Sequence, residues 1–171
     1  MMHLWTVLFL TSERNIQNAD EKKRIARLAA STVKANDTIY IDTGTSTLGI
    51  IDYLVDVPNL TVLTNSILVA SKALAYSSIK TIMLPGIINT RSASSVGNGC
   101  QEYLRRYHMQ KAFMACTGIT EFGAANASPE EYEIKKSALM VYSPLSDIDH
   151  VFTDQLPKKN ICSFSRSTTS S

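Results

Sequence analysis

Hydroxyl side chains crowd one glycine in TIYIDTGTSTLG, residues 38–49, where a run of β-branched residues ends. They are Thr43, Thr45, Ser46 and Thr47, grouped around Gly44 and preceded by Asp42. Gly44 can adopt positive φ and let the main chain approach a ligand, while hydroxyls and the first amides of a following helix donate hydrogen bonds to an anion. This chemistry suits a phosphate. Asp42 disfavours a phosphate, but it can accept hydrogen bonds from the hydroxyls of a sugar.

The same loop has a simpler explanation, in which Thr45 or Ser46 caps a helix after a tight turn. The loop by itself does not separate this explanation from an anion site. No Gly-Lys-Ser/Thr follows Gly44, so the segment is not a Walker phosphate loop.

Two further segments repeat this chemistry. LTVLTNS ends in Thr64, Asn65 and Ser66, and PGIINTRSASSVGNG, residues 85–99, supplies Gly86, Arg91, Ser94 and Gly97. Arg91, the only guanidinium in these loops, can pair bidentately with a phosphate or lie in solvent. Asn and Ser are also common turn and cap residues, so neither segment alone indicates a site. Three such strand ends together favour a pocket.

The elements that must position these residues alternate between two periodicities. Short apolar runs predict buried strands at 38–42, 60–64, 79–84, 112–117 and 150–153, and helical spacing follows at 46–55, 66–76, 99–107 and 129–140. An earlier helix has the apolar stripe Ile25, Leu28, Ala29, Thr32 and Val33, with Asn18 or Asp20 as its cap. The pattern predicts an α/β fold with a doubly wound, mostly parallel sheet and right-handed crossovers. Ligands of such sheets bind beyond the carboxyl ends of the strands.

Composition predicts one soluble domain in a chain of 171 residues with a formal net charge of +2, too small to indicate a nucleic-acid or membrane surface. We expect residues 1–12 to be irregular, 13–157 to form the domain, and the serine-rich end, 158–171, to be disordered. The three cysteines have neither metal-ligand spacing nor an even count, which favours a reducing cytoplasm and cysteines that pack as small apolar side chains. No metal or cofactor is expected.

The order of the motifs resembles the effector-sensing C-terminal domain of DeoR-type transcriptional regulators. The resemblance runs over residues 13–157, through KKRIARLAASTVKANDTIYIDTGTSTLGIIDYL, NLTVLTNS, the glycine of PGIINTRSASSVG, MQKAFMACTGI and EEYEIKKSAL. It implies a fold similar to the ribose-phosphate isomerase, glucosamine-phosphate deaminase and CoA-transferase group, used to sense a phosphorylated sugar or related metabolite. It also implies that the opening segment is a phosphosugar cradle.

What the resemblance implies about the site is a set of ligand-binding residues without a catalytic one. Carried over, these are Asp42 to Thr47, Thr64 to Ser66, the loop from Gly86 to Gly97, and Gly118, Glu133 and Lys135. It implies as partner a second copy of the chain or a full-length relative. With few residues before the first predicted helix, we expect no helix-turn-helix and no sequence-specific DNA binding from this chain.

Two departures from the family pattern concern the site itself. Pro85 stands where a glycine is usual, and it lacks an N–H and fixes φ. After Met140 the chain runs almost directly into PLSDIDHVFTD, so that roughly twenty residues, about one strand with its loops, are expected to be missing. The chain is on this interpretation a truncated copy of a sensor, with weakened ligand binding.

The main alternative is an enzyme of the same fold group, a sugar-phosphate isomerase or deaminase with Glu131 or Glu133 as general base and Lys135 as its electrostatic partner. The simpler interpretation of these charges is a solvated, salt-bridged helix face. A third class, a pure interaction protein, needs no ligand at all.

Overall fold

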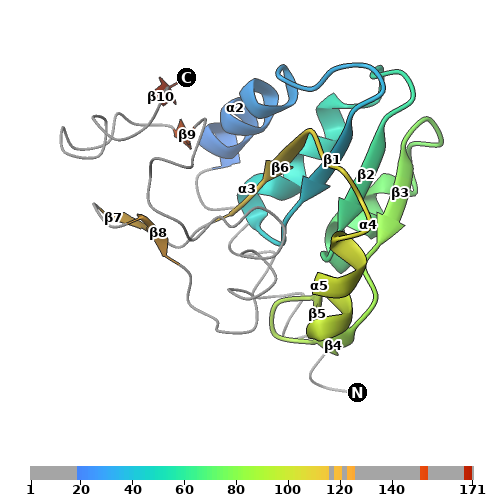
Figure 1. Cartoon of the computed structure of the whole chain (residues 1–171). Coiled ribbons are helices and arrows are strands. Elements are labelled where there is room, and N and C mark those ends of the chain that lie inside the picture. The colour runs from blue at the N-terminus through green and yellow to red at the C-terminus, as the bar shows by residue number, and fades with distance from the viewer. Residues whose placement is uncertain (1–18, 116–117, 121–122, 126–150, 154–167, 171) are drawn as a thin grey trace.

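Four parallel strands form the main sheet of the protein, in the order β3-β2-β1-β6 (Figure 1). The computed structural model describes residues 19–115, 118–120, 123–125, 151–153 and 168–170. The strands are β1 (Thr38–Ile41), β2 (Thr61–Thr64), β3 (Lys80–Met83) and β6 (Lys111–Phe113). In register, Ile41 lies beside Thr64 on one side and Phe113 on the other. The predicted α/β fold with a parallel sheet is confirmed, and the three strands that carry the candidate loops are neighbours.

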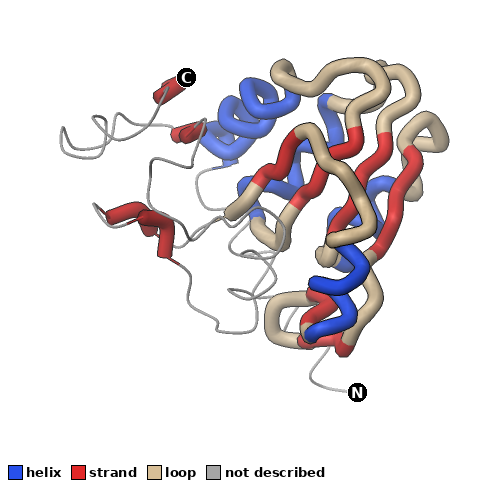
Figure 2. Tube along the Cα trace, viewed as in Figure 1, coloured by secondary structure: helices blue, strands red, loops and turns tan. Residues whose placement is uncertain are grey.

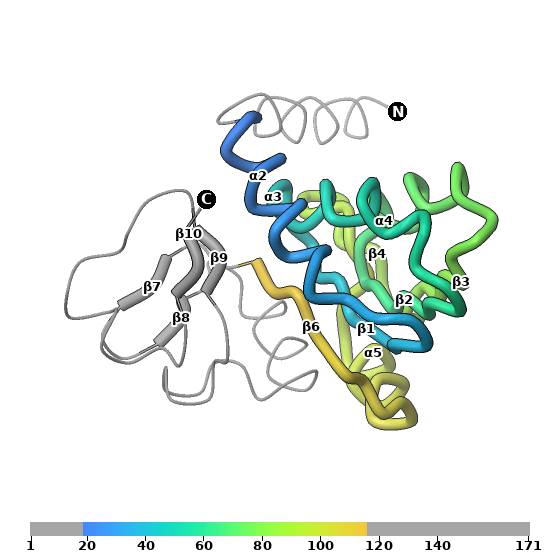
Figure 3. Tube along the Cα trace, turned by 90° about the horizontal axis from the view of Figure 1, so that it is seen from above, coloured from blue at the N-terminus to red at the C-terminus, as the bar shows by residue number. Residues whose placement is uncertain are grey.

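Helices cover both faces of this sheet, as the view from above shows (Figure 3). One face packs against α2 (Ala19–Ala30), the 3-10 helix η1 (Gly49–Tyr53) and α4 (Ile67–Ala73). The other packs against α5 (Asn98–Leu104). Neighbouring strand residues alternate between the two cores: Ile39 and Ile41 lie in the first, and Tyr40 in the second. Because both faces are covered, the strands have no polar alternation in their sequence.

The first helix is predicted correctly, but its buried stripe is displaced. Ala26, Ala29 and Ala30 are buried, whereas Ile25 and Leu28 are only partly so. Small residues are needed on this face because η1 packs closely against it. A Cβ built on Gly49 would lie 3.2 Å from Ala26 Cβ.

The helix predicted at 46–55 is divided into two short pieces. They are α3 (Thr45–Leu48) and η1, which meet at Gly49. Glycine is a poor helix former, and the β-branched Ile50 and Ile51 that follow are buried in the first core. The division brings η1 against α2 while α3 remains at the end of β1.

A hairpin that the sequence interpretation missed lies between β3 and α5, and Figure 2 shows its two strands in red. It consists of β4 (Ile87–Asn89) and β5 (Ser94–Val96), which pair antiparallel. Its turn is closed by Asn89, whose Oδ1 accepts hydrogen bonds from the amides of Arg91 and Ser92 at 3.0 and 3.4 Å. The segment predicted as a loop is therefore a packed element.

Two small sheets complete the described part of the chain. Strands β7 (Gly118–Thr120) and β8 (Gly123–Ala125) pair antiparallel, and β9 (Val151–Thr153) pairs in parallel with β10 (Thr168–Ser170). A strand was predicted near β9, but its partner β10 lies in the tail that was expected to be disordered. The helix predicted at 129–140 lies outside the described residues. Within these ranges no helix has the length and apolar character to cross a membrane, and no group of metal-ligating side chains gathers.

A partly buried ion pair ties the amino-terminal edge of the sheet together. Lys111 Nζ donates to Asp37 Oδ2 at 2.6 Å, and the Lys34 amide donates to the same oxygen at 2.8 Å. Burial raises the pKa of the Asp37 carboxyl, but these two hydrogen bonds and the nearby positive charge lower it more, so that its pKa lies below the ordinary value. The pair joins β1 to β6 at the edge opposite the candidate loops.

This pair makes stability depend on acid. Because the folded pKa of Asp37 is depressed, its contribution is present above the unfolded pKa of about 4 and is lost as pH falls through the folded pKa. Asp37→Asn should lower the free energy of unfolding at pH 7 by about 1–3 kcal/mol, and the difference from wild type should shrink below pH 4. Urea denaturation at several pH values measures this, with the exposed Asp56→Asn as control. A constant difference at all pH values would contradict it.

Candidate functional site

The loop after β1 lies where the strand order of the sheet reverses. From β1 the chain first builds β2 and β3 on one side, and later adds β6 on the other. The carboxyl ends of the two strands beside such a switch point, here β1 and β6, are the usual ligand site of open α/β sheets. Here the Asp42 amide donates to Phe113 O at 2.9 Å, and the Ala115 amide donates to Asp42 Oδ2 at 3.1 Å. Asp42 thereby joins the two strand ends.

Asp42 is fully buried, unlike the residues that follow it. Thr43, Gly44, Thr45 and Ser46 are all partly exposed. The sequence interpretation gave Asp42 a contact with the hydroxyls of a sugar; in the structure its side chain is buried and accepts a hydrogen bond from the Ala115 amide.

Gly44 is required at its position by close packing and not by its backbone angles. Its φ is 179°, an extended conformation that any residue adopts, so the positive φ that glycine allows is not used here. A Cβ built on Gly44 would lie 2.4 Å from Ala115 Cβ and 3.1 Å from Thr47 Oγ1. The main chain of the loop therefore lies directly against the segment after β6.

Only some hydroxyls of the loop form hydrogen bonds with described residues. Thr47 Oγ1 donates to Asp42 O at 2.7 Å and also lies 3.0 Å from Gly44 O, which closes the loop on itself. Gly44 stands at the cap position of α3, and no side chain caps that helix. Thr45 and Ser46 therefore do not act as helix caps. Among the described residues their hydroxyls have no hydrogen-bond partner.

Asn65 is the centre of a buried network beneath this loop. Its Oδ1 lies 2.8 Å from Tyr40 Oη and 3.1 Å from Thr43 Oγ1. Its Nδ2 lies 3.5 Å from Ser95 O, and its own main-chain oxygen accepts from the Ser95 amide at 2.8 Å. Asn65 is 1% exposed. It connects β1, the candidate loop and the hairpin.

The residues on either side of Asn65 hold the strand end and the next helix. Thr64 Oγ1 donates to Ile41 O at 2.7 Å and accepts from the Ser66 amide at 3.0 Å. Ser66 caps α4 by accepting from the Val69 amide at 3.3 Å. Thr64 and Ser66 are both buried. Ser66 thus acts as the helix cap that its residue type suggested.

The hairpin packs its inner strand into the same region. Ser94 and Ser95 are buried, and the Ile67 amide donates to Ala93 O at 2.9 Å. Gly86 has φ +155°, and a Cβ there would lie 2.5 Å from Ser95 Oγ and 2.6 Å from Val96 O. Only glycine fits at this position. The hairpin is thus fixed to the junction of β2 and α4.

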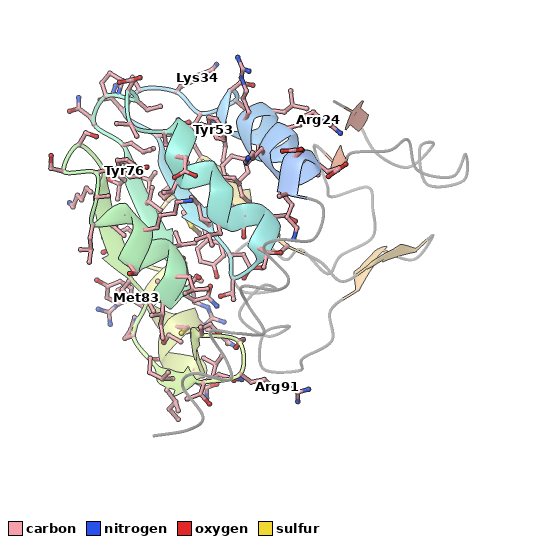
Figure 4. The ribbon with its side chains drawn as sticks, turned by 180° about the vertical axis from the view of Figure 1, so that it is seen from behind. Arg24, Lys34, Tyr53, Tyr76, Met83 and Arg91 are labelled. Atoms are coloured by element: carbon pink, nitrogen blue, oxygen red, sulfur yellow. The ribbon has the colours of Figure 1, made fainter. Side chains whose placement is uncertain are left out.

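The remaining predicted site residues lie further out. Gly97, with φ +108°, is the exposed N-cap residue before α5, and Arg91 is exposed in the hairpin turn. Seen from behind, Arg91 extends away from the ribbon at the end of the molecule opposite Lys34 (Figure 4). Gly118 begins β7. Glu133 and Lys135 lie outside the described residues.

Three residues of this region were not singled out in the sequence, although Ser95 lies within the loop from Gly86 to Gly97 that the family resemblance implied. Tyr40 and Ser95 hold Asn65, and Ala115 contacts both Asp42 and Gly44. Tyr40 read only as an apolar strand residue, although buried tyrosines usually find a hydrogen-bond partner for the hydroxyl. Nothing in the local sequence marks Ser95 or Ala115, because their roles depend on which segments the fold brings together.

Comparison with known proteins assigns this arrangement to a class. A model of the DeoR C terminal sensor domain family matches residues 17–141. The chain belongs to that family, which makes it an effector-sensing domain of the kind found in DeoR-type transcriptional regulators, and the resemblance seen in the sequence is confirmed. The match ends one residue after Met140.

Individual relatives agree with this assignment. The HTH-type transcriptional regulator IolR of Bacillus subtilis (strain 168) is 33% identical, over 88% of this chain and 68% of that protein. The HTH-type transcriptional repressor GlcR of the same strain is 28% identical, over 84% of this chain and 63% of that protein. The uncharacterized HTH-type transcriptional regulator FruR of that strain is 30% identical, over 74% of this chain and 51% of that protein. The chain thus spans between about half and two thirds of these relatives.

A solved structure shares the fold. Ribose 5-phosphate isomerase A from Methanocaldococcus jannaschii superposes with a TM-score of 0.50 at 16% sequence identity, over 73% of this chain and 49% of that one. At this identity the likeness concerns the fold alone. The predicted fold group is confirmed.

Proposed function

We propose that this sensor domain binds a phosphorylated sugar or related metabolite at the loop after β1, and that it reports the ligand within a cytoplasmic regulator without catalysing a reaction or using a cofactor. The observation that carries the proposal is the position of Thr45 and Ser46. Their hydroxyls lie without protein partners in the described region, on a partly exposed loop at the switch point of the sheet. Hydroxyl donors at such a point suit an anionic ligand.

The degree of burial separates candidate residues that can contact the ligand from those that hold the loop in place. The partly exposed residues from Thr43 to Ser46 are placed to contact the ligand. The buried ones hold the loop and the neighbouring strand ends in place; they are Asp42, Thr47, Thr64, Asn65 and Ser66. Gly86 and Gly97 shape the hairpin beside the site. Arg91 in its exposed turn is a candidate for a second phosphate contact, as are Gly118, Glu133 and Lys135 from the family pattern.

The chemistry of these loops favours sensing over catalysis by a base within them, whereas Glu131 and Glu133 of the enzyme alternative lie outside the described residues. The segments 42–47, 64–66 and 86–97 contain one carboxylate, Asp42, and no histidine. Asp42 is fully buried and bonded to the Ala115 amide. A general base must reach the proton that it removes, so Asp42 is poorly placed for isomerase chemistry. The named relatives are transcriptional regulators, which agrees with a ligand sensor.

Partners follow from the same proposal. We expect the domain to act as a homo-oligomer or together with a full-length relative, and not to bind DNA sequence-specifically by itself, because a net charge of +2 gives little attraction to phosphates. Light scattering and a DNA titration by fluorescence anisotropy at physiological salt measure the two expectations.

A thermal-shift panel tests the proposed function. Pentose and hexose phosphates should raise the melting temperature, their unphosphorylated parents should not, and no probe should be turned over. Ser46→Ala should reduce the shift, whereas Ser77→Ala, an exposed serine in the loop before β3, should not. Turnover of a sugar phosphate would favour the isomerase alternative. Equal shifts from phosphorylated and unphosphorylated sugars would contradict a phosphate site.

The affinity itself is expected to be low. If the segment after Met140 is shortened as the sequence suggests, the site lacks a few charge-assisted hydrogen bonds worth about 1.5–3 kcal/mol each, and Kd lies nearer millimolar than micromolar. Calorimetry with the sugar phosphates of the panel measures it. Micromolar affinity would mean that the chain is a complete, compact sensor.

A further inference from the structure

The Thr43 hydroxyl donates its proton to Asn65. Both Tyr40 Oη and Thr43 Oγ1 lie within hydrogen-bond distance of Asn65 Oδ1, at 2.8 and 3.1 Å. An amide oxygen accepts and never donates, so in these two hydrogen bonds the hydroxyls are the donors. Thr43 Oγ1 is left with lone pairs only.

The orientation of the Asn65 carboxamide follows from its other neighbour. Ser95 O lies 3.5 Å from Nδ2, and a main-chain carbonyl oxygen can only accept. Turning the carboxamide over would place two oxygens against each other. The amide nitrogen therefore faces Ser95 and the oxygen faces the two hydroxyls.

Two buried hydroxyls near Thr43 also direct their protons at protein oxygens. Thr47 donates to Asp42 O and Thr64 donates to Ile41 O, each at 2.7 Å. Thr45 and Ser46 differ, since in the described part of the chain no protein group receives their protons. Along a few consecutive residues the loop thus changes from accepting to donating.

We propose that this polarity selects the ligand: Thr43 accepts a hydrogen bond from a hydroxyl of the ligand, while Thr45 and Ser46 donate to its phosphate. The proposal rests on the proposed function and makes it more specific. It defines the ligand class as a polyol or sugar phosphate with a free hydroxyl, and it makes Asn65 a positioning residue that sets the direction of Thr43. Inorganic phosphate or a phosphate ester without hydroxyls satisfies only the donating end.

Three flexible phosphate esters separate these contacts in calorimetric titrations of the whole chain. Sorbitol 6-phosphate carries hydroxyls, diethylene glycol monomethyl ether phosphate carries oxygens that only accept, and n-hexyl phosphate has neither. Thr43→Val should reduce the affinity for sorbitol 6-phosphate about tenfold, which corresponds to roughly one hydrogen bond, and leave the affinities for the other two esters unchanged. Thr43→Ser should restore the affinity. Thr45→Val and Ser46→Ala should weaken all three probes alike.

Other outcomes overturn the assignment in distinguishable ways. If Thr43→Val weakens the ether ester, Thr43 donates and the inferred direction is wrong. If it weakens every probe equally and lowers the melting temperature, Thr43 is merely structural, and if it weakens none, Thr43 makes no contact. In each of these cases the proposed phosphate site survives. If no ester binds to the wild-type chain, the proposed function fails and this inference fails with it.

Discussion

Gly44→Val is expected to reduce sugar-phosphate affinity by at least about a hundredfold and to lower the free energy of unfolding by about 2–3 kcal/mol. A Cβ at this position would lie 2.4 Å from Ala115 Cβ, closer than carbon atoms pack, so the loop must move away from the segment after β6. That movement displaces Thr45 and Ser46, the proposed phosphate contacts. Calorimetry and urea denaturation measure the two effects.

A matched glycine provides the control for this substitution. Gly99 lies in α5, where a Cβ would meet only Pro85 O at 3.8 Å, an ordinary contact. Gly99→Ala should leave affinity unchanged. If Gly44→Val keeps both its affinity and its stability, the loop does not pack against the segment after β6 as described.

Asn65→Leu is expected to cost about 2–4 kcal/mol of stability, a large fraction of the total for a domain of this size. The substitution leaves the hydroxyls of Tyr40 and Thr43 without their shared acceptor and Ser95 O without its amide donor. Unsatisfied polar groups in a buried site cost more than the net value of the bonds that they lose.

The charged variant Asn65→Asp is the informative comparison. An aspartate still accepts from both hydroxyls, but at pH 7 it places a charged oxygen against Ser95 O in a buried site, so it should lose at least as much stability as the leucine variant. Combining Asn65→Leu with Tyr40→Phe should cost less than the sum of the two single losses, since both substitutions break the same hydrogen bond. A loss below about 0.5 kcal/mol for Asn65→Leu, the level of an ordinary surface substitution, would contradict a central role for this network.

The architecture could be predicted because its signals are local. Buried parallel strands read as short apolar runs, and Gly, Thr, Asn and Ser mark the ends of β1 and β2. These patterns located the candidate loops and placed three strand ends side by side. The stripe on α2 was displaced towards its alanines, because the period of a helix defines a face only to within about one residue on either side.

The parts that could not be predicted depend on contacts between distant segments. The sequence interpretation explained Gly44 by its capacity for positive φ, whereas what the position needs is room beside Ala115, some seventy residues later in the chain. The β4–β5 hairpin was missed because strands of three residues carry too little periodicity to be distinguished from a loop. Whether a given threonine contacts a ligand or supports a loop is likewise decided by burial, which residue type alone does not reveal.

The central claim is that the loop after β1 binds a phosphorylated ligand, and a titration followed by amide NMR signals tests it most directly. On adding sorbitol 6-phosphate to the isotope-labelled chain, the amide signals of residues 43–47 should move saturably, whereas those of Asp37 and Lys111 at the opposite edge of the sheet should stay in place. The shifts should be absent with sorbitol. Signals of 43–47 that remain unchanged at saturating ligand, or shifts concentrated at the opposite edge, would contradict the account.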